Sequence, residues 1–355
     1  MSKYILVLLL PLLAATAGFS QGTVVVKGNI KGYTKGSSRV IFYIVRENRP
    51  DSTPVKDNGT FSYRYPFKPG AFVRIFLIYK TGAKESYTHV SLMTDKPATI
   101  VLKDIDPGAG LDDVRIEGDP ITVDYRAYER ASSVSHEELS KLSDSARATR
   151  NTKIARAYVA AHPDSYSSAY VLSSDRSYID HKELALIYEG LSQRIKESRD
   201  GKSVSEFIEG VTESKVGRRV KDFTLPTPDG KTLTFSSLKG KYVLLDFWAS
   251  WCGPCRAAFP HMKEVYSKFK SDRFEIMSIS IDDNRDSWLR QLKAQQLPWL
   301  QVLDDQHLYL HGFAITGVPT TYLIDPDGKI VMKELGFDYT GHGAMEKKLN
   351  ELFEN

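Results

Sequence analysis

Two cysteines, the only ones in 355 residues, stand three positions apart at Cys252 and Cys255. Disulfide exchange needs one thiolate that attacks the substrate and a second thiol close enough to resolve the mixed disulfide. A Cys-x-x-Cys segment at the start of a helix supplies both, because the unpaired N–H groups and the helix dipole favour the thiolate at the first cysteine. The spacing therefore predicts Cys252 as the nucleophile and Cys255 as the resolving thiol.

Two other uses of this cysteine pair compete with redox exchange. Half of a structural zinc site would need two further ligands, but the chain has no second cysteine pair and His261 alone cannot complete the site. A purely structural disulfide would close a loop too small to restrict the unfolded chain much. Redox exchange is favoured over both, and it requires neither a metal nor a cofactor.

Strands and helices alternate around the pair in a way that would position it. A buried strand at Tyr242–Phe247 precedes the cysteines and a helix follows them. Further along we expect a strand at Phe274–Ile281, a helix at Arg285–Gln295, a hairpin of Thr321–Ile324 with Ile330–Glu334, and an amphipathic helix around Met345 to Phe353. Residues 214–355 therefore have the pattern of an α/β redox domain.

The rest of the chain divides into two regions of different character. Residues 22–119 hold short alternating apolar runs separated by turns, which predicts an antiparallel β-sandwich-like accessory domain. Residues 120–213 have apolar residues at helical spacing and predict a helical connecting region. Within it, His162–Ser165 marks a break between helices, and Ser198–Ser203 is expected to form a turn or exposed link.

The N-terminus has the pattern of a secretory signal peptide, assigned to residues 1–21. Lys3 precedes an apolar run, Ile5–Ala15, which is shorter than the roughly 20 residues of a membrane-spanning helix. Small residues follow it and suit cleavage. A periplasmic protein is expected, whereas an uncleaved signal would leave it attached to the membrane. The net charge of +4, from 48 basic and 44 acidic residues, does not favour nucleic acid as a partner.

Three segments carry a resemblance to a known family. Leu245–Arg256, with its Trp-Cys-Gly-Pro-Cys core, resembles the active site of thioredoxins and of exported TlpA/ResA-like thiol–disulfide oxidoreductases. Gly317–Asp325 matches the second hallmark of that family, and Asp222–Leu225 resembles its domain entrance. The resemblance implies an α/β thioredoxin fold in the C-terminal region, within the wider redoxin superfamily related to AhpC/TSA, and protein-disulfide reductase activity.

The resemblance also implies which residues bind the substrate. The proline at Pro319 would be cis and face the cysteines, and Val318 and Pro319 would line a groove for extended substrate backbone. Around the pair itself, Trp251, Gly253 and Pro254 complete the expected substrate-binding residues.

A carboxyl group is the third expected catalytic group. Asp246 lies six positions before Cys252 and matches the family's buried carboxylate, which moves a proton to or from the resolving thiol. Burial would raise the pKa of Asp246, so that it could accept a proton from Cys255 near neutral pH. The alternative is a carboxyl at a strand end that is satisfied by backbone or water.

One departure narrows the expected activity. Ala258 stands where TlpA/ResA-like reductases often carry Glu, so a general exported reductase is favoured over one dedicated to cytochrome maturation. Gly253-Pro254 is similar to general thioredoxin and favours reduction over oxidation. The resemblance implies disulfide-containing envelope proteins as partners and a membrane thiol-relay protein as electron donor.

Two other functions remain open. A thiol peroxidase would fit the redoxin-like segments Asp222–Leu225 and Leu238–Lys241, but Ala249 occupies the place of the Thr or Ser that precedes a peroxidatic cysteine. Alternatively, the N-terminal sandwich would bind an envelope partner and the redox domain would serve only as a structural head. For the accessory region itself, docking, dimerisation and simple spacing are all compatible with the sequence.

Overall fold

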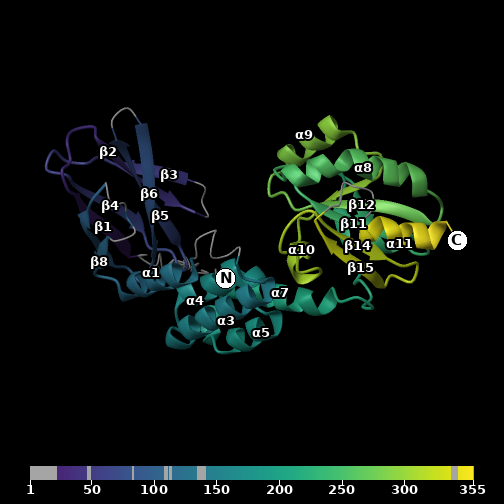
Figure 1. Cartoon of the computed structure of the whole chain (residues 1–355), viewed down its shortest axis with the longest axis horizontal. Helices are drawn as coiled ribbons and strands as arrows, with labels where there is room; N and C mark the ends of the chain where they lie inside the picture. Colours follow the sequence, from purple (N-terminus) through teal and green to yellow (C-terminus); the bar gives the residue numbers. More distant parts are fainter. Residues whose placement is uncertain are drawn as a thin grey trace, which may run out of the picture. The chain divides into compact units, whose positions relative to one another are not determined.

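The computed structural model describes residues 22–45, 49–81, 84–107, 111, 114–133, 141–336 and 343–354 (Figure 1). The chain forms two compact units, residues 1–126 and 127–355. The predicted signal peptide lies outside the described residues. Within those residues, no helix combines the length and apolarity needed to span a membrane. The helical region groups with the redox domain, and the finer division at residues 119 and 213 stays a prediction.

The first unit contains two four-stranded sheets. Their strands are β1 (Thr23–Ile30), β2 (Ser38–Ile44), β3 (Arg49–Thr53), β4 (Thr60–Pro66), β5 (Phe72–Thr81), β6 (Lys84–Met93), β7 (Thr99–Ile105) and β8 (Arg115–Glu117). The sheet orders are β4-β1-β7-β8 and β3-β2-β5-β6, and one apolar core that includes Val26, Phe42 and Leu77 draws residues from both. The predicted sandwich is confirmed, with one difference. The β1–β7 pair is parallel, because the chain crosses to the other sheet before β7 returns beside β1.

Helices make up the next part of the chain. They are α1 (Pro120–Ser132), α3 (Asp144–Ala161), α4 (Tyr166–Asp175), η1 (Arg176–Tyr178), α5 (His181–Glu189), α6 (Gln193–Lys196) and α7 (Arg199–Glu213). The predicted break at His162–Ser165 is confirmed: α3 ends at Ala161, and the Ser165 hydroxyl caps α4 by accepting a hydrogen bond from the N–H of Ser167.

The expected turn at Ser198–Ser203 is wrong, because this segment is the first part of α7. The Ser198 hydroxyl accepts a hydrogen bond of 3.1 Å from the N–H of Gly201 and so caps the helix. Gly201 suggested a turn in the sequence, but here it allows close packing: an added Cβ would overlap the carbonyl oxygen of Ile195.

The C-terminal part is built on a five-stranded sheet of order β13-β12-β11-β14-β15. Its elements are β9 (Thr224–Pro226), β10 (Thr232–Thr234), η2 (Phe235–Leu238), β11 (Tyr242–Trp248), α8 (Gly253–Phe269), β12 (Phe274–Ser280), α9 (Arg285–Gln295), β13 (Leu300–Leu303), α10 (Leu308–His311), β14 (Thr320–Ile324), β15 (Ile330–Leu335) and α11 (Ala344–Phe353). The central strand β11 pairs in parallel with β12 and antiparallel with β14. The predicted thioredoxin fold is confirmed.

Side chains of β11 alternate between two apolar cores. Leu244 and Trp248 belong to the core that contains Cys255 and residues of α8 and α11, whereas Leu245 and Phe247 belong to the core on the other face. Because successive strand residues point to opposite faces, Asp246 points to the same face as Leu244 and Trp248. The fold thus places this carboxyl on the side of the sheet that α8 covers.

Candidate active site

The cysteine pair lies where β11 ends and α8 begins. Cys252 and Cys255 are joined by a disulfide, with their Cα atoms 5.3 Å apart. Cys252 is the N-cap of α8, and its sulfur accepts a hydrogen bond of 3.1 Å from the backbone N–H of Cys255. This N–H belongs to the first turn of the helix, where it and the helix dipole stabilise negative charge. After reduction, a thiolate is therefore favoured at Cys252.

Exposed residues border the buried disulfide. Cys252 is 4% exposed and Cys255 is 1% exposed, whereas Trp251 is 66% exposed. Gly253 and Pro254 are exposed as well. A partner protein that reaches the disulfide would first meet these three neighbours and then the sulfur of Cys252.

The loop before β14 meets the cysteine pair. The peptide bond between Val318 and Pro319 is cis, which confirms the expectation drawn from the resemblance. The carbonyl oxygen of Val318 lies 3.6 Å from the sulfur of Cys252. On the other side of Pro319, the hydroxyl of Thr320 donates a hydrogen bond of 2.6 Å to the carbonyl oxygen of Gly317 and closes the loop. The structure thus brings Val318 and Cys252 together.

Asp246 is 1% exposed and lies in the middle of the sheet. In the strand register it faces Ser278 of β12 on one side and Thr321 of β14 on the other. Burial raises the pKa of Asp246 to about 6, and a hydrogen bond of 2.7 Å from the Ser278 hydroxyl opposes part of that rise. The predicted elevation of this pKa is confirmed. A carboxyl group with this pKa can exchange a proton near neutral pH.

A second buried carboxylate holds the segment before the cysteines. Asp282 follows β12 and accepts hydrogen bonds from the N–H and the hydroxyl of Ser250, at 2.8 and 2.6 Å. The Ser280 hydroxyl donates a third hydrogen bond of 2.6 Å to the same carboxylate. Because Ser250 lies two residues before Cys252, this clamp fixes the backbone that leads into the reactive pair.

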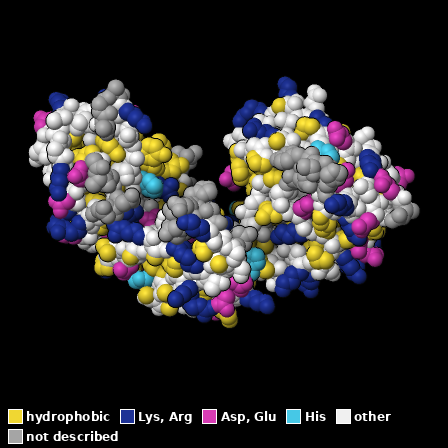
Figure 2. Space-filling view, viewed as in Figure 1, with side chains coloured by type: hydrophobic (Ala, Val, Ile, Leu, Met, Phe, Trp, Pro, Cys, Tyr) yellow, Lys and Arg dark blue, Asp and Glu magenta, His cyan; other side chains and the backbone are white. Residues whose placement is uncertain are grey.

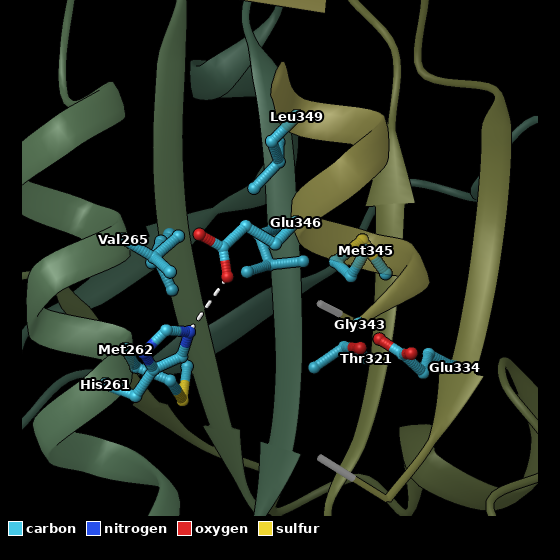
Figure 3. Close-up of a pocket in the computed structure, with 11 residues that line it drawn as sticks. His261, Met262, Val265, Thr321, Glu334, Gly343, Met345, Glu346 and Leu349 are labelled. Carbon is cyan, nitrogen blue, oxygen red and sulfur yellow. Dashed lines mark hydrogen bonds and ion pairs between the residues drawn. The ribbon is translucent and has the colours of Figure 1, made fainter. Parts of the chain in front are cut away.

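A small cavity of about 30 Å³ lies between α8, α11 and the sheet (Figure 3). Its walls include Met262 and Leu349, and Thr321 also lines it. At one edge, Nε2 of His261 and a carboxylate oxygen of Glu346 are 2.9 Å apart. The volume suits about one water molecule.

Among the described residues, no group of His, Cys, Asp and Glu side chains is arranged to hold a metal ion.

Comparison with known proteins places this site in a family. Residues 216–333 match the AhpC/TSA family. The thiol–disulfide oxidoreductase ResA of Bacillus subtilis is 36% identical over 115 residues, which span 32% of this chain and 64% of the relative. ResA of Bacillus cereus is 32% identical over 122 residues, which span 34% of this chain and 70% of the relative. The chain belongs to the TlpA/ResA-like thiol–disulfide oxidoreductases of the thioredoxin family.

Solved structures cover a slightly larger share of this TlpA/ResA-like chain. The thioredoxin domain of a thiol–disulfide oxidoreductase from Bacteroides vulgatus is 33% identical, covers 40% of this chain and 99% of that domain, and gives a TM-score of 0.35. A thiol–disulfide oxidoreductase from Bacteroides fragilis is 31% identical, covers 38% of this chain and all of that chain, and gives a TM-score of 0.34.

Several residues of this TlpA/ResA-like site were missed by the sequence analysis. They are Ser250, Ser278, Ser280, Asp282 and Trp299, which supply the hydrogen bonds around the two buried carboxylates. A pattern in the sequence could have identified three of them. Ser278, Ser280 and Asp282 alternate with isoleucines at the end of β12 and just after it, and polar side chains on one face of a buried strand need hydrogen-bond partners.

Proposed function

We propose that this chain is an exported thiol–disulfide oxidoreductase that reduces disulfides in other proteins. The observation that carries the proposal is the Cys252–Cys255 disulfide at the first turn of α8, with the carbonyl oxygen of Val318 3.6 Å from the Cys252 sulfur. Both sulfurs are buried, but Cys252 is the N-cap of α8 and its sulfur lies beside the Val318 carbonyl, whereas Cys255 lies within the first turn of the helix. Attack and resolution are thereby assigned to different sulfurs.

The reaction begins from the reduced pair. The Cys252 thiolate attacks one sulfur of the substrate disulfide, a mixed disulfide forms, and the other substrate sulfur leaves as a thiolate that takes a proton from water. Cys255 then attacks the Cys252 sulfur, which breaks the bond to the substrate and releases the second substrate thiolate. Two electrons pass to the substrate, and the enzyme is left with the Cys252–Cys255 disulfide that the structure contains.

Resolution requires that Cys255 lose its proton. Asp246 points to the face of the sheet on which Cys255 is buried, and burial raises the pKa of Asp246 to about 6. At neutral pH most of this carboxyl is ionised and can accept the thiol proton. Val318, Pro319, Trp251, Gly253 and Pro254 are assigned to binding the substrate backbone.

The proposed partners are disulfide-containing envelope proteins and a membrane thiol-relay protein that returns two electrons to the Cys252–Cys255 disulfide. Export rests on the signal-like sequence of residues 1–21, and the periplasm is the proposed location. Basic and acidic side chains are interspersed on the face shown in Figure 2, which supports protein partners over nucleic acid. The β-rich domain at residues 22–119 would position the redox domain at residues 214–355 or dock a substrate.

Insulin reduction and mixed-disulfide trapping test the proposal together. The purified chain, reduced beforehand, should cleave the insulin disulfides, and Cys252→Ser should abolish the reaction. Cys255→Ser should instead leave Cys252 able to attack, so that a substrate protein stays attached through a bond that dithiothreitol releases. A folded wild-type protein without insulin reduction, together with no trapped partner in an envelope extract, would favour a binding module.

The AhpC/TSA match supports a second candidate, a thiol peroxidase. The site fits this activity less well, because Ala249, which is fully buried, has no hydroxyl to offer a peroxide three residues before Cys252. Stopped-flow mixing of the reduced protein with hydrogen peroxide decides between the two activities. Rapid turnover that Cys252→Ser removes would favour the peroxidase.

A further inference from the structure

The carboxyl of Asp246 is the end of a short chain of hydrogen bonds. The Ser278 hydroxyl donates to a carboxylate oxygen of Asp246 at 2.7 Å, and the indole N–H of Trp299 donates to the Ser278 oxygen at 2.8 Å. Ser278 is fully buried and Trp299 is 5% exposed. An indole N–H can only donate, so the chain runs in one direction, from Trp299 through Ser278 to Asp246.

We propose that Ser278, oriented by Trp299, is a positioning residue that keeps the Asp246 carboxylate ready to take the proton of Cys255. This inference rests on the proposed disulfide reductase activity and deepens it. With the indole N–H bound to its oxygen, the Ser278 hydroxyl directs its hydrogen to the carboxylate, and hydrogen bonds in such a chain polarise one another.

The hydrogen bond from Ser278 is the main interaction that stabilises the ionised carboxylate of Asp246. Burial disfavours the charged carboxylate, and the Ser278 hydrogen bond acts in the opposite direction. On the neighbouring strand, Thr321 faces Asp246 in the register, but its hydroxyl is not among the hydrogen-bond donors that act on the Asp246 carboxyl. Among the described residues, the titratable side chains that line the cavity on this face are His261 of α8, Glu346 of α11 and Glu334 of β15. Tyr266 of α8 lies in the same core as the two cysteines. His261 and Glu346 pair with each other at 2.9 Å.

Removing the Ser278 hydroxyl should raise the pKa of Asp246. Without the Ser278 hydroxyl, only burial acts on the carboxyl, so the pKa of Asp246 should rise further above 6. Near pH 6 a larger fraction of Asp246 would then hold a proton and could not accept one from Cys255. Resolution of the mixed disulfide should therefore slow in mildly acidic buffer and recover at higher pH.

A carboxyl titration of the full chain tests the proposal. Carbon-13 NMR of aspartate-labelled protein follows each carboxyl against pH, and Asp246→Asn identifies the Asp246 signal. We expect Ser278→Ala to raise the Asp246 midpoint by about one pH unit, because a hydrogen bond to a charged group is lost. Trp299→Phe should raise it by a smaller amount, since the hydroxyl remains but loses its fixed orientation. Ser278→Thr keeps the hydroxyl and should restore the wild-type midpoint.

Two matched variants separate this effect from general disturbance of the core. Thr321→Val removes a hydroxyl beside the same carboxyl, on the other neighbouring strand, and should leave the midpoint unchanged. Trp288→Phe removes an indole N–H that is fully buried and has no hydrogen-bond partner in the part of the chain that is described. It should also leave the midpoint unchanged.

Insulin reduction measured from pH 5 to 8 supplies the second readout. A rise of one unit would lower the rate of Ser278→Ala at pH 6 by about five-fold, with recovery by pH 8. Equal midpoints for Ser278→Ala and Thr321→Val would overturn the proposal. A raised midpoint with an unchanged pH profile would overturn its link to proton transfer. A wild-type protein that reduces no insulin at any pH would instead refute the proposed function.

Discussion

One buried aspartate lies within β11 and another follows β12, and the two differ in how many side-chain and backbone donors bind their carboxyl groups. Asp246 on β11 receives one side-chain hydrogen bond, from Ser278. Asp282, just after β12, receives three, two from Ser250 and one from Ser280. The same residue type at nearly the same burial thus serves two purposes. A carboxylate with many donors anchors a loop, whereas one with few donors in an apolar setting can exchange a proton.

The two carboxylates also act on different parts of the reactive pair. Asp282 fixes Ser250, two residues before Cys252, and so acts on the backbone that presents the nucleophile. Asp246 lies on the core side, where Cys255 is buried. Replacing Asp282 should therefore lower the stability of the protein, whereas replacing Asp246 should raise it at neutral pH.

The largest expected effect is at Asp282. Asp282→Ala should lower the free energy of unfolding by about 4 kcal/mol, because three buried donors lose a charged acceptor at once. Urea unfolding at pH 7 measures this loss. All four tryptophans lie between residues 248 and 299, so their fluorescence reports on the redox domain. Asp283→Ala, at the exposed neighbouring position, is the control and should change stability little. Equal losses for the two variants would contradict the clamp.

Asp246→Asn should have the opposite effect at neutral pH. The folded-state pKa of Asp246 is raised to about 6 from an ordinary value of 3.8, so folding becomes less favourable as the pH rises through this interval. Above pH 6 the carboxyl is ionised in both states and the full cost is present. Removing the ionisable group should therefore stabilise the protein by about 3 kcal/mol at pH 7.

The pH dependence is the internal control for Asp246→Asn. Near pH 4 the folded wild-type carboxyl is protonated and close to half of the unfolded carboxyl is too, so the gain in stability should nearly vanish. A gain of the same size at pH 4 and pH 7 would show that packing, and not the raised pKa, is its cause. Reductase activity should fall in this variant, because the amide cannot accept the proton of Cys255.

Much of the site could be predicted from local sequence. The Cys-x-x-Cys spacing between a buried strand and a helix indicated the reactive pair, and the Gly-Val-Pro-Thr segment indicated the cis bond before Pro319. Asp246 was identified because its place six positions before Cys252 matches the buried carboxylate of the thioredoxin family. The reactive pair follows from its spacing, whereas the cis bond and Asp246 came from the resemblance of short motifs to that family.

The residues that were missed depend on strand register. Ser278 meets Asp246, and Asp282 meets Ser250, each across 32 positions of sequence, because β11 and β12 run in parallel with one fixed alignment. Trp299 reaches Ser278 from the segment before β13. No local pattern gives that alignment. The wrong turn at Ser198–Ser203 has a similar cause, since Gly201 is required by its contact with Ile195 on the preceding helix.

The smallest expected change in stability is at Ser250, and it measures one of the three hydrogen bonds to Asp282. Ser250→Ala removes the side-chain donor and keeps the backbone N–H, so it should lower the free energy of unfolding by about 1.5 kcal/mol. In the Asp282→Ala background the same change should cost almost nothing, because the hydroxyl no longer has its charged acceptor. The difference between the two values is the coupling energy of this one hydrogen bond. Additive losses in the double variant would mean that Ser250 stabilises the loop independently of Asp282, and the contrast between the two carboxylates would then rest on the other two donors.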